Sequence, residues 1–481
     1  MSELQNTIPV KNTGYRRFIG GQIVSLLGSE IVGFVMAIYL TRKYESPLYM
    51  AIVMILQYLP RVIICPIAGV WADKRNRKKV IITSDLLQAV VTSSLVLLFT
   101  FNTKYSFSFW EAGEIYIIFS FLLLRSILQA IQGPSVSSTL PSIVPMEKLS
   151  RINGVFQFAN GVMGLIAPIL AAVLISVFNL PEFTEYNLMW IDAITFIAAL
   201  GFVLSVKIPE HPNAEEEATT QQQERRFKKF KSDFSEGISV MKTIVGLSGL
   251  LATFVLTNVL VSPMNTLSDI LILITHEGTN LEYVFSSVSF ALGLITGSII
   301  ASLKKSWKKM TSAMFLGIIM VFAGLFIFGV TPNYEHLPGT FLGIRTPFWI
   351  IAAGGFITTF GIPIMSTIAV TMIQLSVPIE KMGRFSGFMS AIISFFTPIG
   401  YLISGVLGEY LNIHWVIGTT SIIAITTMIL LLRYSKISSI EPIVKEKLAM
   451  VKQQAAAQAQ KQQMHEPEIA QSDDLETSVQ E

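Results

Sequence analysis

Several ionisable side chains interrupt the long apolar runs of this 481-residue chain, and four of them are considered first. Glu30 stands in SLLGSEIVGF, Arg61 in YLPRVIICP, Arg125 in LLLRSILQAIQG and Asp269 in NTLSDILILI. In the hydrocarbon of a bilayer, a charged side chain costs at least about 2.5–3.5 kcal/mol on insertion scales, so each of these is a candidate for function. A carboxylic acid in such a place can exchange a proton near neutral pH. The chemistry that these residues indicate is therefore proton exchange and the binding of charged groups.

Glu30 and Arg125 are the first pair to consider, because each lies near the middle of its apolar run. Arginine stays protonated in any protein environment. Arg125 could therefore stabilise ionised Glu30 until substrate or a conformational change separates the two groups. The alternatives are structural: Glu30 as half of a buried ion pair, and Arg125 as a donor to backbone carbonyls.

The remaining polar candidates each have two interpretations. Arg61 would bind an anionic part of a substrate or neutralise one of the acids, and Asp269 is either a second acid of a central cavity or a hydrated group at its outer mouth. Asn258 and Asn265 are seven residues apart and share one helical face, from which they would bond substrate or a neighbouring helix. Asp192, in NLMWIDAITF, is expected to bond backbone or hydroxyl groups near the outer boundary.

The elements that must hold these residues are transmembrane helices. Hydrophobic residues make up 52% of the chain and charged residues only 14%, against about 25% in soluble domains. Apolar runs of about 18 or more residues recur from end to end, and each can cross roughly 30 Å of hydrocarbon as a helix, which satisfies its own backbone hydrogen bonds. We predict an all-α membrane protein with twelve spans, near residues 17–40, 48–71, 79–101, 114–137, 152–178, 187–206, 247–273, 282–303, 311–330, 346–373, 384–408 and 411–433.

The distribution of basic residues predicts the orientation. With both termini in the cytoplasm, 29 of the 35 Lys and Arg residues fall on the cytoplasmic side, as the positive-inside rule requires. The positive charge is thus a topological signal, and the net charge of +3 gives no reason to expect nucleic acid as a partner.

Several function classes find no support in the motifs. The sequence contains no GxxxxGK[ST] loop for ATP, and its single cysteine, Cys65, allows neither an intramolecular disulfide nor a cysteine zinc cluster. No nucleophile–His–Asp set is evident. We therefore expect neither an enzyme nor a cofactor, and an ion or substrate gradient as the source of energy.

An internal repeat divides the chain in two. Residues 144–154 read VPMEKLSRING and residues 377–387 read VPIEKMGRFSG, and each segment opens the fifth predicted span of its half. Two pseudo-symmetric six-helix bundles around a central cavity are a design of secondary transporters. The predicted parts are an N-terminal cytoplasmic tail (1–16), a first bundle (17–208), a cytoplasmic linker (209–246), a second bundle (247–435) and a disordered cytoplasmic tail (436–481).

The linker has a helical pattern of its own. In ERRFKKFKSDFSEGISV, Phe227, Phe230, Phe234 and Ile238 share one face and Lys and Arg residues lie opposite. This pattern predicts an amphipathic helix at the membrane surface.

The stretch GVWADKRNRKKV (69–80) concentrates six charged residues in twelve. Its pattern Gly69-x-x-x-Asp73-Lys74-x-Asn76-Arg77-Lys78 resembles the signature loop between helices 2 and 3 of the major facilitator superfamily. Asn76 stands where that family usually has glycine. Since asparagine tolerates positive φ better than most other residues, we expect the tight turn to be kept.

The resemblance implies the fold of that family and a conformational latch. In the family, the acid at the position of Asp73 contacts the other half of the protein and holds the outward-open state. The residues that we assign to the latch are Gly69, Asp73, Lys74, Arg77, Lys78 and, one turn inside the third span, Asp85.

Further segments resemble one branch of this family. SFALGLITGS (289–298), the PxNxL pattern at Pro263 and the segment 383–415 are similar to macrolide-efflux proteins of Gram-positive bacteria. VPMEKLSRING also resembles the matching loop of related siderophore exporters. Arg125-x-x-x-Gln129 resembles the family's second motif, whose arginine is linked to proton coupling. Glu30 departs from the macrolide branch and is similar to the acids that proton-coupled multidrug antiporters carry in this helix.

Our principal hypothesis is a proton-coupled efflux pump of the bacterial plasma membrane. It would export amphipathic drug-like compounds such as macrolides by alternating access, as a monomer, with substrate, protons and the lipid bilayer as its partners. The alternative is an exporter or flippase of an endogenous anionic molecule, such as a siderophore or lysolipid, for which Arg61 is the reason. A third hypothesis is a membrane sensor or scaffold with this fold.

Overall fold

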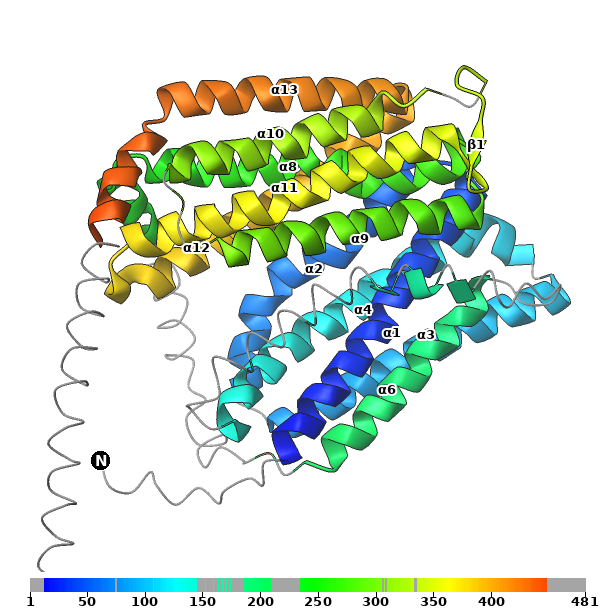
Figure 1. Ribbon diagram of the computed structural model, residues 1–481. Helices are drawn as coiled ribbons and strands as arrows, with labels where there is room; N and C mark the ends of the chain where they lie inside the picture. The colour runs from blue at the N-terminus through cyan, green and yellow to red at the C-terminus, as the bar shows by residue number, and fades with distance from the viewer. Residues whose placement is uncertain are drawn as a thin grey trace, which may run out of the picture.

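The residues that the structure describes fold almost entirely into helices (Figure 1). The computed structural model describes residues 13–73, 76–106, 108–144, 185–206, 208, 234–304, 307, 309–332 and 335–447, and scattered positions between 152 and 174. In the first half the elements are α1 (Thr13–Tyr44), α2 (Pro47–Asp73), α3 (Arg77–Tyr105), α4 (Ser108–Ile143), η1 (Glu185–Leu188) and α6 (Met189–Leu204). In the second half they are α8 (Leu247–Ile270), η2 (Leu271–Thr275), α9 (Asn280–Leu303), α10 (Met310–Gly329), β1 (Thr340–Phe341), β2 (Ile344–Arg345), α11 (Thr346–Ser376), α12 (Ile379–Tyr410), α13 (Ile413–Tyr434) and η3 (Ile437–Ser439).

The helices match the predicted spans closely. Within the described residues, ten helices are long and apolar enough to cross a membrane, and α6 is a shorter apolar helix. These eleven helices correspond to eleven of the twelve predicted spans. The predicted span at 152–178 lies mostly outside the described residues.

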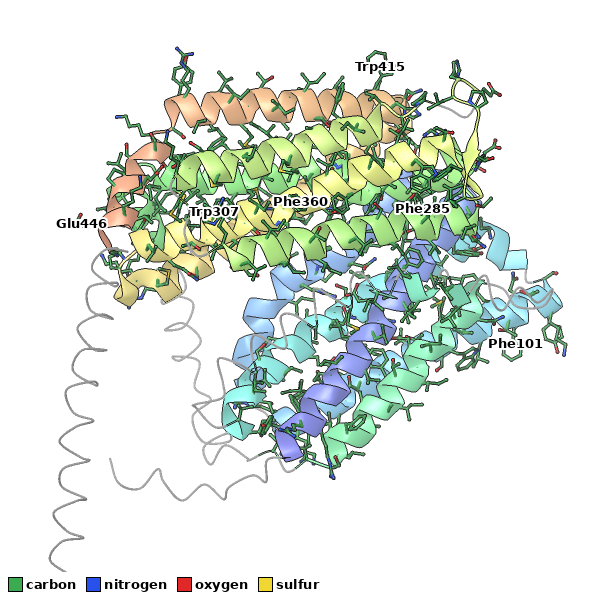
Figure 2. All side chains as sticks on the ribbon, viewed as in Figure 1. Phe101, Phe285, Trp307, Phe360, Trp415 and Glu446 are labelled. Atoms are coloured by element: carbon green, nitrogen blue, oxygen red, sulfur yellow. The ribbon has the colours of Figure 1, made fainter. Side chains whose placement is uncertain are left out.

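Large apolar side chains cover the outer faces of the helices. Trp415 on α13 is 72% exposed and Phe101 on α3 is 46% exposed, and both point away from the helices around them (Figure 2). Such surfaces are unfavourable in water and favourable against acyl chains. The exposure therefore agrees with lipid as the surrounding solvent.

The helices form two bundles, and each is built from one half of the chain (Figure 1). In the first, α1 packs on α6, α3 packs on α4 and α6, and α2 packs on α4. In the second, α11 packs between α9 and α10, and α8 packs on α12 and α13. The principal contact between the bundles joins α2 to α12.

The bundles meet at one end and diverge at the other (Figure 1). We call the meeting end the hairpin end, because it carries the β1–β2 hairpin, and the opposite end, where α1 begins and α13 ends, the terminal end. At the hairpin end Arg42 Nη2 donates to Asn280 Oδ1 at 2.8 Å, and the rings of Phe34 and Tyr283 lie 5.6 Å apart. Each of these contacts joins α1 to α9.

A carboxylate at the start of α2 strengthens this closure. Glu409, at the end of α12, accepts from Ser46 Oγ at 2.5 Å and from the backbone N–H of Leu48 at 3.3 Å. The first N–H groups of a helix have no partner within the helix and carry a partial positive charge, so an acid there is favourable. Glu409 therefore ties the first bundle to the second.

The close approach of α12 to α2 depends on a glycine. A Cβ atom added at Gly405 would lie 2.2 Å from the Ala51 Cβ and 3.0 Å from the Pro47 carbonyl oxygen. Because neither of these atoms can move without its backbone, only glycine fits at this position.

A buried histidine lies beneath the hairpin end of the second bundle. The His276 side chain is 5% exposed, and neither ring nitrogen has a hydrogen-bond partner among the described residues. Its ring lies edge-on to that of His414 at 5.4 Å, and Phe348 is 6.0 Å away. Burial, followed by the charges of His414 and Arg345, lowers the pKa of His276 to about 4.

The α2–α12 seam gives a first prediction. Gly405→Ala should separate the bundles at the hairpin end, since overpacking costs about 1–3 kcal/mol, which changes a conformational equilibrium about 5–150-fold. A longer spin-label distance between α2 and α12 at this end would show it. Gly387→Ala is the matched control, because a Cβ on Gly387 of the same helix meets nothing within 4 Å. Equal distances in both variants would contradict the prediction.

His276 gives a prediction for pH. Its folded-state pKa of about 4 lies below the ordinary histidine value of 6.5, so the unfolded chain takes up a proton first as the pH falls. Its contribution to stability is present above about pH 6.5 and is lost as the pH falls towards about 4, by on the order of 3 kcal/mol. Melting temperatures from pH 7 to pH 4 should decline less in His276→Phe than in the native protein. An equal fall of the melting temperature in the native protein and in His276→Phe would refute the assignment of this pH dependence to His276.

Candidate functional site

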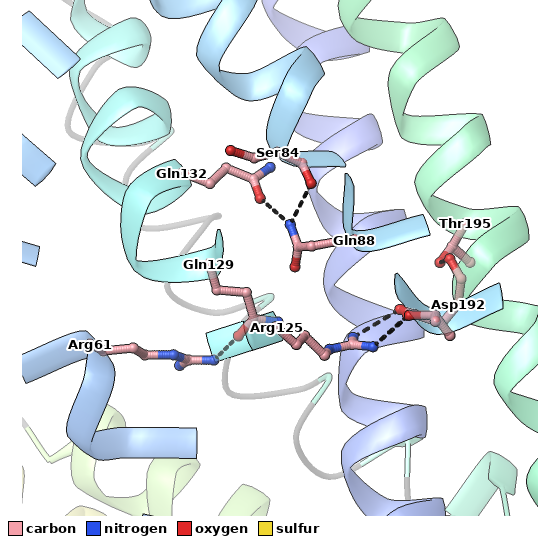
Figure 3. Close-up of polar contacts among 9 residues, drawn as sticks. Arg61, Ser84, Gln88, Arg125, Gln129, Gln132, Asp192 and Thr195 are labelled. Atoms are coloured by element: carbon pink, nitrogen blue, oxygen red, sulfur yellow. Dashed lines mark hydrogen bonds and ion pairs between the residues drawn. The ribbon is translucent and has the colours of Figure 1, made fainter. Parts of the chain in front are cut away.

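A buried ion pair joins α4 to α6 inside the first bundle (Figure 3). Arg125 Nη1 donates to Asp192 Oδ2 at 2.5 Å, and Nη2 donates to Oδ1 at 3.0 Å. Arg125 is 5% exposed and Asp192 is fully buried. This bidentate geometry is the strongest form of the arginine–carboxylate interaction, so the two charges compensate each other.

Neighbouring groups complete this ion pair. The Thr92 hydroxyl on α3 donates to Asp192 Oδ2 at 2.8 Å, and the Arg125 guanidinium lies 5.6 Å from the centre of the Phe196 ring. On the far side, a Cβ added to Gly28 of α1 would lie 2.0 Å from Thr195 Oγ1 and 3.0 Å from the Asp192 Cα. Gly28 therefore lets α1 contact the turn of α6 that carries the acid.

Glu30 lies two residues after Gly28 on α1. Since each residue of a helix turns by about 100°, Glu30 points away from the face that contacts α6. It is half-buried, and within the described part of the chain its carboxylate has neither a hydrogen bond nor an ion pair. The guanidinium groups of Arg61 and Arg125 are near enough to act on it electrostatically. Arg125 therefore acts on Glu30 through its charge and not through a hydrogen bond. Its Nη1 and Nη2 groups donate to Asp192 instead.

Arg61 is the exposed member of this set. Its Nη2 donates to Gln129 Oε1, which lies one turn after Arg125 on α4 (Figure 3). Among the described residues no acid forms an ion pair with Arg61. The interpretation that Arg61 neutralises an acid of the protein therefore finds no support in this conformation. The interpretation that it binds an anionic group of a substrate stays a prediction.

A second polar group lies between α3 and α4, nearer the terminal end. Gln132 Nε2 donates to Asp85 Oδ1 at 2.7 Å. Gln88 Nε2 donates to Gln132 Oε1 at 2.8 Å and to the Ser84 carbonyl at 3.3 Å (Figure 3). Asp85 is fully buried. The side-chain partner of this predicted latch residue therefore lies inside the first bundle.

The candidates on α8 lie apart from this set. Asp269 accepts from Tyr283 at 3.0 Å, near the seam at the hairpin end. Asn258 Nδ2 donates to the Phe254 carbonyl of its own helix at 2.9 Å, and Asn265 is exposed. The structure does not bring these three residues into contact with Glu30 or Arg125.

The basic part of the predicted latch binds carbonyl groups. Arg77 Nη1 donates to the Ser138 carbonyl at 3.0 Å, and Lys78 Nζ donates to the Leu204 and Val206 carbonyls at 3.1 and 2.7 Å. Lysine at a helix C-terminus is favourable, so Lys78 helps to end α6. α2 ends at Asp73, but the Asp73 side chain, the surroundings of Gly69 and the whole of Lys74 lie outside the described residues.

The expectation for Asn76 was wrong. Its φ is −62° rather than positive, and its side chain accepts the backbone N–H of Lys79 at 3.1 Å as the N-cap of α3. Asparagine is among the best N-cap residues. Asn76 therefore begins α3 as its cap and does not adopt the left-handed conformation that we expected.

The described part of the linker packs on the second bundle. Residues 234–243 are helical; the Phe234 ring lies 4.9 Å from that of Phe388, and Glu236 forms an ion pair with Arg384. Arg384 belongs to the second copy of the repeat. Phe227 and Phe230 lie outside the described residues.

The fold and these buried charges define a class of protein. Two helical bundles with lipid-facing surfaces and ion pairs in their interiors are characteristic of membrane transporters. Among the described residues, no three His, Cys, Asp or Glu side chains are placed to hold a metal ion. The chain belongs to the Major Facilitator Superfamily, whose model matches residues 18–338.

Relatives support this assignment. The chain is 26% identical to Macrolide efflux protein A of Streptococcus pyogenes over 396 residues, which covers 82% of this chain and 89% of that protein. It is 24% identical to the Staphyloferrin A transporter of Staphylococcus aureus over 40% of this chain and 47% of that protein.

Solved structures agree on the fold. A bacterial homologue of the iron transporter ferroportin in its inward-facing state has a TM-score of 0.61 at 13% identity, covering 87% of this chain and 98% of that one. A bacterial homologue of the lysosomal transporter Spinster, inward-facing and unoccupied, has a TM-score of 0.57 at 11% identity, covering 92% and 99%.

Sequence reasoning missed Asp192 as the partner of Arg125. The two residues are 67 positions apart, and Asp192 stands three residues after the start of α6, so it was assigned to the outer boundary. One signal was available: a protein interior requires an acid for a buried arginine, and Asp192 is an acid in an apolar run of the same half.

The buried pair gives a third prediction. Asp192→Asn leaves the Arg125 guanidinium buried and unpaired, which should lower the free energy of unfolding by about 3–5 kcal/mol. Arg125→Leu combined with Asp192→Leu removes both charges and should be less destabilising than the single changes added together. A double-mutant cycle of thermal stability in detergent measures this coupling.

A surface pair provides the control. Lys445 forms an exposed ion pair with Glu441, so Lys445→Gln should change stability by at most about 1 kcal/mol. An Asp192→Asn variant as stable as Lys445→Gln would mean that Arg125 does not depend on Asp192.

Proposed function

We propose that this protein is a proton-coupled exporter of amphipathic, drug-like compounds and that Glu30 is its proton-exchanging group. The observation that carries the proposal is the state of Glu30: a half-buried carboxylate in mid-helix, with no hydrogen bond or ion pair in the described part of the chain. An acid that is fixed in a structural pair cannot exchange its proton readily, whereas an unbound acid can.

The electrostatic surroundings of Glu30 support this role. Arg125 is neutralised by Asp192, and Arg61 is held by an uncharged amide. Both guanidinium groups act on Glu30 through their positive charge. A shift of either arginine as the bundles move would therefore change the proton affinity of Glu30.

The orientation that we propose places the hairpin end outside and both termini in the cytoplasm, as the distribution of Lys and Arg indicates. In this orientation the bundles are closed outside and diverge towards the cytoplasm (Figure 1). The conformation is then one from which an exporter would load its substrate. Entry of one proton supplies about 2.3 kcal/mol per 100 mV, enough for accumulation against a gradient of roughly tens-fold.

The relatives make macrolides the first compounds to test. Macrolide efflux protein A of Enterococcus faecalis is 25% identical over 346 residues, which cover 97% of that protein. A basic amphipathic compound would be attracted to the Glu30 carboxylate, so that proton and substrate would compete for one group.

An anionic substrate is the second candidate. The exposed guanidinium of Arg61 is the observation that favours it, since arginine binds carboxylate and phosphate through two parallel donors. A siderophore or a lysolipid would present such a group, and the Staphyloferrin A transporter is among the relatives.

Transport by variants in proteoliposomes separates the two candidates. With an imposed proton gradient, Glu30→Gln should reduce accumulation of a cationic macrolide at least tenfold, because glutamine cannot release a proton. Glu30→Asp should retain part of the activity, and Asp269→Asn, which alters an acid at the hairpin end, should retain most of it.

The opposite pattern would favour the alternative. Transport that survives Glu30→Gln but fails in Arg61→Ala would indicate an anionic substrate and would refute Glu30 as the coupling group. Drug-susceptibility panels of cells with and without the protein would then identify the class of compound.

A further inference from the structure

Asp85 is a buried acid without a cationic partner. Its side chain is completely excluded from solvent between α3 and α4. Oδ1 accepts from Gln132, but Oδ2 has no hydrogen-bond partner among the described residues. An ionised carboxylate in this state would lose its hydration with little compensation.

The charged groups around Asp85 do not supply the missing charge. On α4, Arg125 is occupied by both oxygens of Asp192, and Asp192, on α6, acts on Asp85 as a like charge. On α2, Arg61 is exposed and bonded to Gln129. The buried charged groups here are therefore two acids, Asp85 and Asp192, and one base, Arg125.

The basic residues at the start of α3 are occupied elsewhere. Arg77 and Lys78, about two turns before Asp85, donate to carbonyl groups of α4 and at the end of α6. Neither forms an ion pair with Asp85. One added proton would make the set of Asp85, Asp192 and Arg125 neutral.

The amide groups beside Asp85 also lack one donor. Gln132 uses its Nε2 for Asp85 and its Oε1 for Gln88. Gln88 Oε1 is buried and has no donor among the described residues. Gln88 follows Asp85 by three residues on α3 and so lies beside it on the helix surface. A proton on Asp85 Oδ2 would supply a donor where an acceptor is free.

Reversing the amides does not remove this requirement. If Gln88 and Gln132 were both flipped, Gln132 Oε1 would face Asp85 Oδ1, and two acceptors would meet. That contact would itself need a proton on Asp85. Both orientations of the network thus lead to the same protonation state.

We propose that Asp85 is a second proton-binding site of this protein, occupied in the present conformation. The route to it runs along α4: exposed Arg61 contacts half-buried Gln129, and Gln132 lies one turn further along, bonded to Asp85. Any role of Asp85 in the transport cycle rests on the proposed proton coupling. The presence of a proton on Asp85 does not depend on that proposal.

A sodium ion is the competing occupant, and the number of ligands argues against it. Among the described residues, the buried side-chain oxygens of α3 and α4 without a hydrogen-bond partner are Asp85 Oδ2, Gln88 Oε1 and Ser135 Oγ. Hard cations generally coordinate about six or more oxygens. A proton needs only one.

Infrared spectroscopy of the full-length protein in lipid nanodiscs at neutral pH tests the proposal. A protonated carboxylic acid has a C=O stretching band above the amide band, and deuterium exchange shifts it. We expect such a band in the native protein and its loss in Asp85→Asn. Glu114→Gln is the matched control, because Glu114 is 2% exposed and ion-paired with Lys43, so this change should leave the band intact.

Stability provides a second measurement. Asparagine has the shape of a protonated aspartic acid, so Asp85→Asn should melt close to the native protein. Asp85→Ala leaves Gln132 without its acceptor and should melt several degrees lower. An Asp85→Asn protein that folds but shows no loss of the band would overturn the proposal, as would a sodium-dependent change of a carboxylate band.

The outcome is independent of the transport assay. If Glu30→Gln transports normally while the Asp85 band is present, proton coupling through Glu30 fails and the Asp85 site stands. If the band is absent and Glu30→Gln is inactive, only the Asp85 site fails.

Discussion

The interior of the first bundle excludes water, and its organisation follows from the need to neutralise charge there. A guanidinium cannot lose its proton, so Arg125 requires a carboxylate, and Asp192 supplies it through two hydrogen bonds. That pair fixes the distance between α4 and α6. Thr92 adds α3 to the same contact, and Gly28 admits α1 against the turn that carries Asp192. One ion pair thus sets the relative positions of four helices.

The seam between the bundles is of another kind. At the hairpin end the contacts are single hydrogen bonds, a ring pair and the carboxylate of Glu409 at the start of α2. Such contacts are partly exposed and individually weak, so they can be exchanged for a different set without unfolding either bundle. Strong bonds within a bundle and weak bonds between bundles are what rigid-body movement requires.

The sequence predicted the helices well because the bilayer makes the rule simple: apolar length determines which segments can span it. It also made Glu30, Arg61 and Arg125 candidates, because charge in an apolar run is conspicuous. It could not choose the partner of Arg125, since α6 reaches α4 only through tertiary packing. Asn76 was misjudged for a local reason: its side chain offered capping as well as a left-handed turn, and hydrogen bonding favoured the cap.

The pairing of Arg125 with Asp192 has a consequence for Glu30. Had Arg125 bound Glu30 directly, the two groups would have to separate before the acid could readily take up a proton. Asp192 takes the Nη donors of Arg125, and Arg125 and Arg61 act on Glu30 only through their charge. The charge state of such an acid responds to displacements of the neighbouring guanidinium groups. The structural ion pair therefore makes an exchangeable acid possible on the opposite face of α1.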